Sequence, residues 1–362
     1  MVLVSNGPGE DWIGAKLGLA LTHLGVRVTP VPLVGPGHHY QAMGLDPVGG
    51  HSFFKSGGFY RSWASVWGDL KAGAMGTIWR QYRQLRDLTR SVTAMIAVGD
   101  VACLAMVRHH RHPVFFLPTA KSDRMAPHWP LEYALIKRWA RGVFPRDPET
   151  TASFRAHHIP AWYEGNIMMD GLVPDEALPP LSPSRRVVVL PGSRAESAAN
   201  LGRVMAALSE TPSLALVIEI PPSMDPAPLY QILRDAQMIE TPDGFGCPRR
   251  SWTLRFSTTF PSATLAAQVV IGMAGTANEQ AAYLHKPVLT LTGTGPQTTP
   301  RRMTEQARLM PGIHYVGDPS PAMFRDHLEQ ALAVSPRPLP APQSAAPLVA
   351  ARIIENTLSC VS

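Results

Sequence analysis

Short apolar runs alternate with helical patterns through the first half of the chain. A run of consecutive apolar residues is typical of a buried strand, and apolar residues that recur every three or four positions are typical of a helix. Strands that alternate with helices favour a parallel sheet covered by helices on both faces. The patterns predict strands at 2–5, 26–33, 94–98, 114–117 and 142–144, and helices at 11–24, from 100 onward and at 131–140.

The second half repeats this alternation after a proline-rich stretch at 173–185, which we interpret as a linker. A second proline-rich segment, 336–342, is predicted to be a stiff connector to a last helix at 346–358. We expect this helix to cross back to the first domain. The other strands expected in the second half are 187–190, 214–220, 269–271 and 288–291, and the other helices are 197–208, 229–236, 276–284 and 302–310.

The chain of 362 residues is therefore predicted to contain two α/β domains. We expect them at 1–172 and 186–335, joined by the linker 173–185 and followed by the connector and C-terminal helix at 336–362. Both are predicted to be Rossmann-like, with doubly wound parallel sheets facing each other across a cleft, where ligands bind at the carboxyl ends of the strands. A periplasmic-binding-protein-like architecture is the alternative, and a start without a signal peptide disfavours it.

The composition is that of a soluble globular protein. Hydrophobic residues make up 45% of the chain and charged residues 17%, which excludes a disordered or fibrous protein. The three cysteines are far apart and the 13 histidines show no ligand spacing, so neither a disulfide framework nor a metal site is expected. The longest apolar run, 93–107, is too short to cross a bilayer. We therefore expect a cytoplasmic protein.

The net charge of +6 comes largely from one segment. Residues 55–90 contain seven basic and two acidic side chains, and arginines line one face of a predicted helix within 61–90 that also carries tryptophans. Such a helix can lie on an anionic membrane surface. The alternative is a helix packed on the sheet with a solvated basic face. Because no recognition motif accompanies the segment, a nucleic-acid partner is not predicted.

Three loops of the second half connect the end of a strand to a helix. In the first, Gly192 permits a tight turn, and Ser193 and Arg194 provide a helix start and a guanidinium that could hold a phosphate or diphosphate. The alternative is a helix N-cap serine beside a surface arginine.

In the second loop, small side chains at Gly275 and Thr276 let the backbone approach a ligand closely. Glu279 falls in the first turn of the next helix, where its carboxylate could accept both hydroxyls of a ribose. The alternative is that the helix dipole alone favours an acid there. The third loop, 291–302, is long and polar, as loops that contact ligands often are.

In the first half, a glycine-rich turn at 5–11 follows the first strand. It lacks the third glycine of a dinucleotide fingerprint, and no acidic residue ends the second strand, so a dinucleotide site is not predicted. Asp11 fits a helix N-cap. Asp100 follows the strand 94–98, where its carboxylate could take a proton from an attacking hydroxyl or cap a helix.

Taken in order, these motifs resemble lipid-A-disaccharide synthase and, more closely, the lipid-A-disaccharide synthase-related family. The resemblance covers most of the chain. It is carried by SNGPGED at 5–11, SGGF at 56–59, GNIMMDG at 165–171, LPGSR at 190–194, MAGTANEQ at 273–280 and GPQ at 295–297.

The resemblance implies a GT-B fold, with the nucleotide sugar in the second domain and the acceptor in the first. Asp100 falls where the synthase has an essential aspartate, and Arg194 would meet the charge that develops on the leaving diphosphate. The donor residues so implied are Gly192, Ser193, Arg194, Gly275, Thr276, Glu279 and Gln297, and the acceptor-side residues are Asn6, Gly7, Gly9 and Asp11.

The activity so implied is that of a UDP-sugar-dependent, metal-independent, inverting hexosyltransferase without a cofactor. Its acceptor would be a lipid or lipid-linked molecule at the cytoplasmic membrane face, with the protein bound peripherally through residues 61–90. Two alternatives remain open, a UDP-N-acetylglucosamine 2-epimerase-like isomerase and a non-catalytic protein that binds a sugar nucleotide or a lipid.

Overall fold

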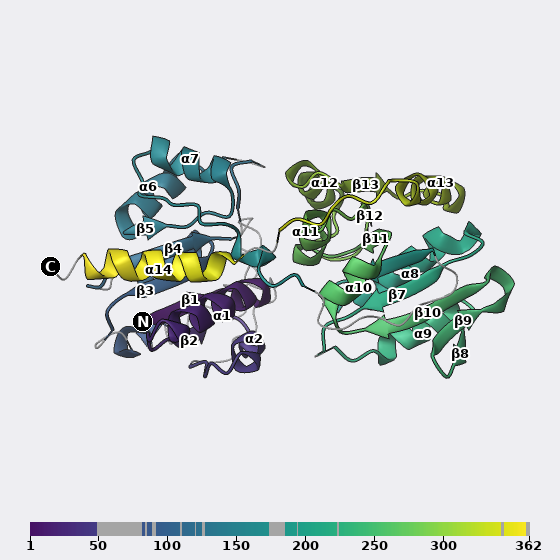
Figure 1. Ribbon diagram of the computed structural model, residues 1–362, viewed down its shortest axis with the longest axis horizontal. Helices are drawn as coiled ribbons and strands as arrows, with labels where there is room; N and C mark the ends of the chain where they lie inside the picture. Colours follow the sequence, from purple (N-terminus) through teal and green to yellow (C-terminus); the bar gives the residue numbers. More distant parts are fainter. Residues whose placement is uncertain are drawn as a thin grey trace, which may run out of the picture. The chain divides into compact units, whose positions relative to one another are not determined.

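The computed structural model divides into two compact units, Met1–Asp170 with Gln343–Ser362 (unit 1) and Gly171–Pro342 (unit 2). Within the part of the chain that the structure describes, each unit contains one sheet with helices packed on it (Figure 1). The residues described are 1–48, 82–83, 85–88, 92–108, 111–119, 121–124, 127–173, 185–193, 195–222, 224–341 and 344–359.

Unit 1 is built on a five-stranded parallel sheet in the order β2-β1-β3-β4-β5. Its strands are buried because helices cover both faces, as parallel sheets require. The chain leaves the neighbouring strands β1 and β3 in opposite directions, so a topological switch point lies between them. The strands are β1 Val2–Ser5, β2 Thr29–Pro32, β3 Met95–Gly99, β4 Val114–Pro118 and β5 Gly142–Val143.

Alternate strand residues point to opposite faces of this sheet. Val4 and Phe116 face the side covered by α5, α6 and α7, and Leu3 and Ile96 are buried on the other side, against which α1 packs with α14 beside it (Figure 1). The described helices of unit 1 are α1 Pro8–His23, α2 His38–Ala42, α5 Val101–Val107, α6 Pro130–Trp139, α7 Pro148–Ala156, a 3-10 turn at Ile167–Met169, and α14 Ala345–Leu358.

The C-terminal helix α14 returns to unit 1, which confirms the expected crossing. Asp170 fixes its start, because its Oδ1 accepts a hydrogen bond from the backbone N of Ala345 at 2.9 Å and its Oδ2 accepts one from that of Ala346 at 2.7 Å. The first amides of a helix have no partner within the helix itself. The carboxylate of the GNIMMDG motif at 165–171 therefore caps a helix far along the chain.

We predict that Asp170→Ala loosens α14. The change leaves two buried N–H groups without acceptors, at a cost of about 1–3 kcal/mol for each group left unsatisfied. Hydrogen exchange of the α14 amides should become at least about tenfold faster. Asp225→Ala is the matched control, because Asp225 Oδ1 accepts from Ala227 N at the exposed start of α9 (Ala227–Asp235). Equal exchange of α14 in both variants would contradict this role of Asp170.

Unit 2 is built on an eight-stranded sheet in the order β13-β12-β11-β6-β7-β10-β9-β8. The pairs from β13 to β10 are parallel, and β10, β9 and β8 pair antiparallel. The switch point of this sheet lies between β6 and β11. The strands are β6 Arg186–Leu190, β7 Ala215–Glu219, β8 Ile239–Thr241, β9 Gly244–Cys247, β10 Trp252–Ser257, β11 Val269–Gly272, β12 Val288–Leu291 and β13 Ile313–Gly317.

Helices cover both faces of the unit 2 sheet. Val189 and Ile218 face α8, α9 and α13, and Val188 and Val217 face α10 and α11. The helices are α8 Ser197–Ala207, α9, α10 Phe260–Ala266, α11 Thr276–Tyr283, α12 Pro300–Leu309 and α13 Pro321–Leu332, with 3-10 turns at Leu208–Glu210 and Pro248–Arg250.

The sequence patterns identified the strands around both switch points, and they missed several elements elsewhere. α1 begins at Pro8 rather than at 11, because a proline fits the first turn of a helix. β2 begins at Thr29 rather than at 26, since no ladder pairs residues 26–28. Elements that were not predicted are α2, α7, α10, α13, β13, β10 and the hairpin β8–β9, whose edge strand β8 is exposed and has no apolar run.

The basic segment at 61–90 lies outside the described residues except at 82–83 and 85–88. Its proposed contact with a membrane therefore stays a prediction. Among the helices in the described ranges, none is long and apolar enough to cross a membrane.

Candidate functional site

Polar side chains meet at the switch point of unit 1. Asn6 directly follows β1 and Asp100 directly follows β3, and Asn6 Nδ2 donates a hydrogen bond to Asp100 Oδ1 at 2.8 Å. A Cβ on Gly99 would lie 1.9 Å from Asn6 Oδ1, and Gly99 has a φ of +145°. Glycine is therefore required there for the two side chains to meet.

Asp100 is the N-cap of α5, since its Oδ1 also accepts a hydrogen bond from Cys103 N at 3.0 Å. Burial raises the pKa of its carboxyl, and the hydrogen bonds from backbone amides and Asn6 oppose that rise. The capping interpretation is thus correct for the structure. It is compatible with a proton-accepting role, because a raised pKa makes a carboxylate a stronger base.

Glu10 is a second carboxylate at this edge, although its position in the sequence did not mark it as a candidate. It is buried, and Thr119 Oγ1, after β4, donates to its Oε1 at 3.4 Å. A Cβ on Gly7 would lie 2.5 Å from Glu10 Oε2, so the glycine at position 7 leaves room for this side chain. Arg146, after β5, donates to the Thr119 carbonyl at 3.2 Å. Residues from the ends of β1, β3, β4 and β5 and from the start of α1 therefore gather at one edge.

Asp11 does not join this group and is not an N-cap. Gly7 is the N-cap of α1 and Gly9 lies in its first turn, which places Asp11 four residues after the cap with its side chain turned into the core. Its Oδ1 accepts from Ser5 Oγ at 2.6 Å, and Tyr40 Oη lies 2.8 Å from the same hydroxyl. The N-cap interpretation of Asp11 was therefore wrong.

Burial raises the pKa of Asp11 to about 7, although the hydrogen bond from Ser5 lowers it, and the nearby charge of Glu10 adds to the rise. Between about pH 4 and pH 7 the folded protein therefore binds more protons at Asp11 than the unfolded chain does. The free energy of unfolding consequently falls as the pH rises through this window, by roughly 4 kcal/mol at most for a shift of about three units.

We predict that Asp11→Asn removes this dependence, because the amide does not ionise and can still accept from Ser5. The melting temperature of the variant should rise relative to that of the wild type as the pH is raised from 5 to 8. Asp225→Asn, at an exposed position, is the control and should follow the wild-type curve. Parallel curves for Asp11→Asn and wild type would contradict a buried, protonated Asp11.

The loop after β4 contains a further carboxylate–histidine pair. Asp123 Oδ1 lies 2.5 Å from His128 Nδ1, and Tyr133 Oη donates to Asp123 Oδ2 at 2.6 Å. Burial would raise the pKa of Asp123, but the hydrogen bonds from His128, Ser153 and Tyr133 outweigh it and hold this pKa well below its ordinary range. The His128 ring packs against Tyr133 and Phe154. These contacts fix the loop on α6 and α7, and we assign the pair a structural role.

In unit 2, glycines and small side chains lie at the switch point between β6 and β11. Gly192, just after β6, has a φ of +94°, and a Cβ there would lie 3.1 Å from the Met273 carbonyl after β11. Gly275 is the N-cap of α11, and its carbonyl accepts from Gln306 Nε2 at 2.7 Å. Thr276 begins α11 and is exposed. Backbone amides at a helix start beside such glycines suit an anion.

The loop after β12 contacts both α8 and the loop that connects β6 to α8. Asn200 of α8 accepts from Thr294 N at 2.9 Å through its Oδ1. Gly295 has a φ of +95°, and a Cβ there would lie 2.1 Å from Glu196 Oε1, so the two loops touch. Gln297 Oε1 lies 3.4 Å from the position of a Cβ on Gly275. The fold thus brings Gln297 next to Gly275.

The remaining candidates of unit 2 are Glu279, Ser193 and Arg194. Glu279 is buried in the first turn of α11. Ser193 is exposed and precedes α8, whose N-cap is Glu196, so Ser193 is not the helix cap that the sequence suggested. Arg194 lies outside the described residues. Neither side chain is therefore assigned a contact.

The sequence matches no family model and no curated protein. Solved structures match almost its whole length. One is a protein described as a candidate UDP-N-acetylglucosamine 2-epimerase from Listeria monocytogenes, with 14% identity and a TM-score of 0.62, covering 100% of this chain and 96% of that one. The glycosyltransferase SnogD from Streptomyces nogalater has 14% identity and a TM-score of 0.55, covering 98% of each chain.

A third match is UDP-GlcNAc 2-epimerase from Neisseria meningitidis, solved bound to UDP-GlcNAc, with 14% identity, a TM-score of 0.51 and 99% of each chain covered. The chain has a GT-B fold. At these identities the likeness establishes the GT-B fold alone, and kinship with lipid-A-disaccharide synthase stays a prediction. In this fold, unit 1 is the N-terminal domain and unit 2 the C-terminal domain.

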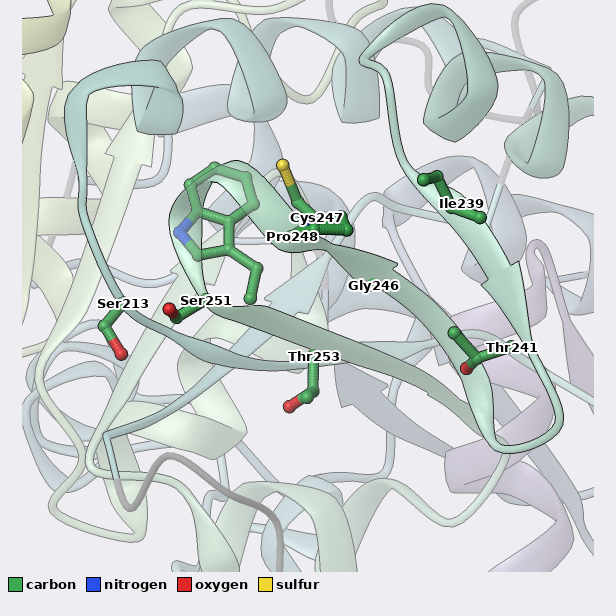
Figure 2. Close-up of a pocket in the computed structure, with 9 residues that line it drawn as sticks. Ser213, Ile239, Thr241, Gly246, Cys247, Pro248, Ser251 and Thr253 are labelled. Carbon is green, nitrogen blue, oxygen red and sulfur yellow. The ribbon is translucent and has the colours of Figure 1, made fainter.

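A hollow of about 480 Å³ lies elsewhere on unit 2 of the GT-B fold (Figure 2). Ser213 precedes β7 and Thr253 lies near the start of β10, so the hollow is at the amino ends of these strands, opposite the carboxyl edge. Its lining, which includes Ile239, Thr241 and Cys247, has no charged side chain. We therefore assign it no part in the site. Nowhere in the described ranges do three potential metal ligands cluster.

Proposed function

We propose that this GT-B protein transfers a sugar of the N-acetylglucosamine type from its UDP conjugate to a hydroxyl of a lipid or lipid-linked acceptor. The observation that carries the proposal is the placement of candidate residues at both switch points. Gly192, Gly275 and Gln297 lie at that of unit 2, and Asn6 and Asp100 at that of unit 1. Open α/β sheets bind ligands at such points.

In the proposed reaction, the acceptor hydroxyl oxygen attacks the anomeric carbon of the sugar. A new glycosidic C–O bond forms, the bond between the anomeric carbon and the diphosphate oxygen breaks, and UDP leaves with the electron pair. Attack from the side opposite the leaving group inverts the anomeric centre.

Asp100 would accept the hydroxyl proton, and Asn6 would orient its carboxylate through the 2.8 Å hydrogen bond. The charge on the leaving diphosphate would be met by the backbone amides that begin α11 and by Arg194. Glu279 would bind the ribose and Gln297 the sugar. No step needs a metal ion.

The proposal also specifies a lipid acceptor and a location at the cytoplasmic membrane face. They are supported by the basic segment at 61–90 and by the resemblance of the sequence motifs.

The second candidate is a UDP-N-acetylglucosamine 2-epimerase-like isomerase, which the TM-score of 0.62 to the Listeria protein favours. The purified chain should be incubated with UDP-GlcNAc, with and without vesicles of bacterial total lipid. The proposal predicts UDP release that depends on the vesicles. Conversion of UDP-GlcNAc without lipid would favour the isomerase, and binding without any conversion would favour a non-catalytic protein.

A further inference from the structure

Glu219 is a carboxyl group at the candidate nucleotide site that the motifs did not identify. It ends β7 at the carboxyl edge of the unit 2 sheet, where it pairs in register with Ser257 of β10. β6, which leads into the Gly192 loop, is the neighbour of β7 on its other side. Alternation along β7 puts the Glu219 side chain on the face of Val217, which α10 and α11 cover.

The carboxyl of Glu219 has no hydrogen bond and no ion pair within the described part of the chain. Burial alone raises its pKa to about 7. Two ionisable residues share this face of the sheet with Glu219. Arg255 of β10 forms an ion pair with Asp243, with 3.7 Å between Nη2 and Oδ2, and Glu279 lies in the first turn of α11. Helix α10 has no titratable side chain. Glu219 is partly exposed at the end of the strand, and an acid with a raised pKa and no partner in such a place is a candidate for ligand binding.

The order of the strands sets the direction of a ligand along this edge. A diphosphate at the switch point would lie between β6 and β11, and Gln297 follows β12, beyond β11. If the sugar lies toward Gln297, the other end of the nucleotide sugar extends over β7 and β10. That end carries the nucleobase, and Glu219 ends β7.

We propose that Glu219 recognises the nucleobase, its carboxyl forming a pair of hydrogen bonds with the N3–H and an adjacent carbonyl of uracil. This inference rests on the function proposed above. A protonated carboxyl offers one donor beside one acceptor, which is the complement of the imide edge of uracil. With a pKa near 7 the group is largely neutral at slightly acid pH and ionises above it. A carboxylate would face the uracil carbonyls without a donor.

The test measures the binding of UDP and of inorganic diphosphate to the full chain at pH 6.5 and pH 8.5. Glu219→Ala should lower the affinity for UDP at pH 6.5 by about tenfold or more, as expected for the loss of two hydrogen bonds. The affinity for inorganic diphosphate should not change. Glu219→Gln keeps a donor and an acceptor, so it should bind UDP as the wild type does at pH 6.5. Glu240→Gln, at an exposed position on β8, is the matched control.

The two pH values separate recognition from a structural role. Wild-type affinity for UDP should fall more between pH 6.5 and pH 8.5 than that of Glu219→Gln, which cannot ionise. If Glu219→Ala binds UDP like the wild type, or if Glu219→Gln shows the wild-type pH dependence, the inference is wrong while the proposed function stands. If the wild type binds no UDP at either pH, the proposed function fails and this inference fails with it.

Discussion

Asp100→Asn is expected to lower the rate of sugar transfer by about 10²–10⁴-fold, the range over which a positioned general base contributes. The amide cannot accept the hydroxyl proton, but its Oδ1 can still accept from Cys103 N, as the carboxylate does in capping α5. The fold should therefore persist, since the change keeps the shape of the side chain. Binding of UDP should be unaffected, because Asp100 belongs to unit 1 and the donor residues to unit 2.

The rate is measured as UDP released from UDP-GlcNAc in the presence of lipid vesicles. Asp225→Asn serves as the control, since Asp225 is exposed, accepts a hydrogen bond from Ala227 N at the start of α9 and has no proposed role in transfer. Activity of Asp100→Asn within a few-fold of wild type would show that Asp100 only caps α5. On the acid side, the wild-type rate should also begin to fall at a higher pH than the pKa of an ordinary aspartate would give, because burial raises the pKa of Asp100.

Gly275→Ala is expected to weaken UDP binding by about ten- to hundredfold, since losing one hydrogen bond to a charged diphosphate costs about 1.5–3 kcal/mol. The added methyl would lie where the backbone approaches the diphosphate. It is tolerated by the protein itself, because the nearest atom to the new Cβ is Gln297 Oε1 at 3.4 Å and the φ of Gly275 is −90°. The loss should therefore be in binding rather than in folding.

Gly202→Ala is the matched control, because it adds the same methyl in α8 with no atom closer than 3.7 Å. Equilibrium dialysis against labelled UDP measures the affinity, and the melting temperature reports the fold. Equal affinities for the two variants would mean that no ligand approaches Gly275. A large fall in the melting temperature of Gly275→Ala alone would mean that the glycine serves the fold.

The strands that position both candidate sites could be predicted because buried parallel strands leave continuous apolar runs, such as 187–190. The exact start of α1 could not be predicted, since Pro8 and Gly9 are weak helix formers in a helix interior. They are helical here because they occupy the first turn, where proline is favoured. That shift matters for the site. A helix that begins at Pro8 directs Glu10 to the edge and Asp11 to the core, whereas the sequence favoured Asp11 for the acceptor side.

Contacts between distant segments could not be predicted from the sequence either. Asn6 and Asp100 are 94 residues apart, and only the β1–β3 pairing makes them neighbours. The same is true of Asn200 and the loop after β12. Glu219 could have been noticed as the one acid that ends the apolar run 214–218, although its lack of a partner is visible only in the folded sheet.

The central claim is that the carboxyl edge of unit 2 holds a nucleoside diphosphate between the ends of β6 and β11. The most direct test is a crystal of the full chain soaked with UDP. The account predicts the two phosphates beside Gly192 and the first turn of α11, with the uracil toward Glu219. UDP bound at any other place on the molecule, in crystals whose unit 2 edge is open to solvent, would contradict it.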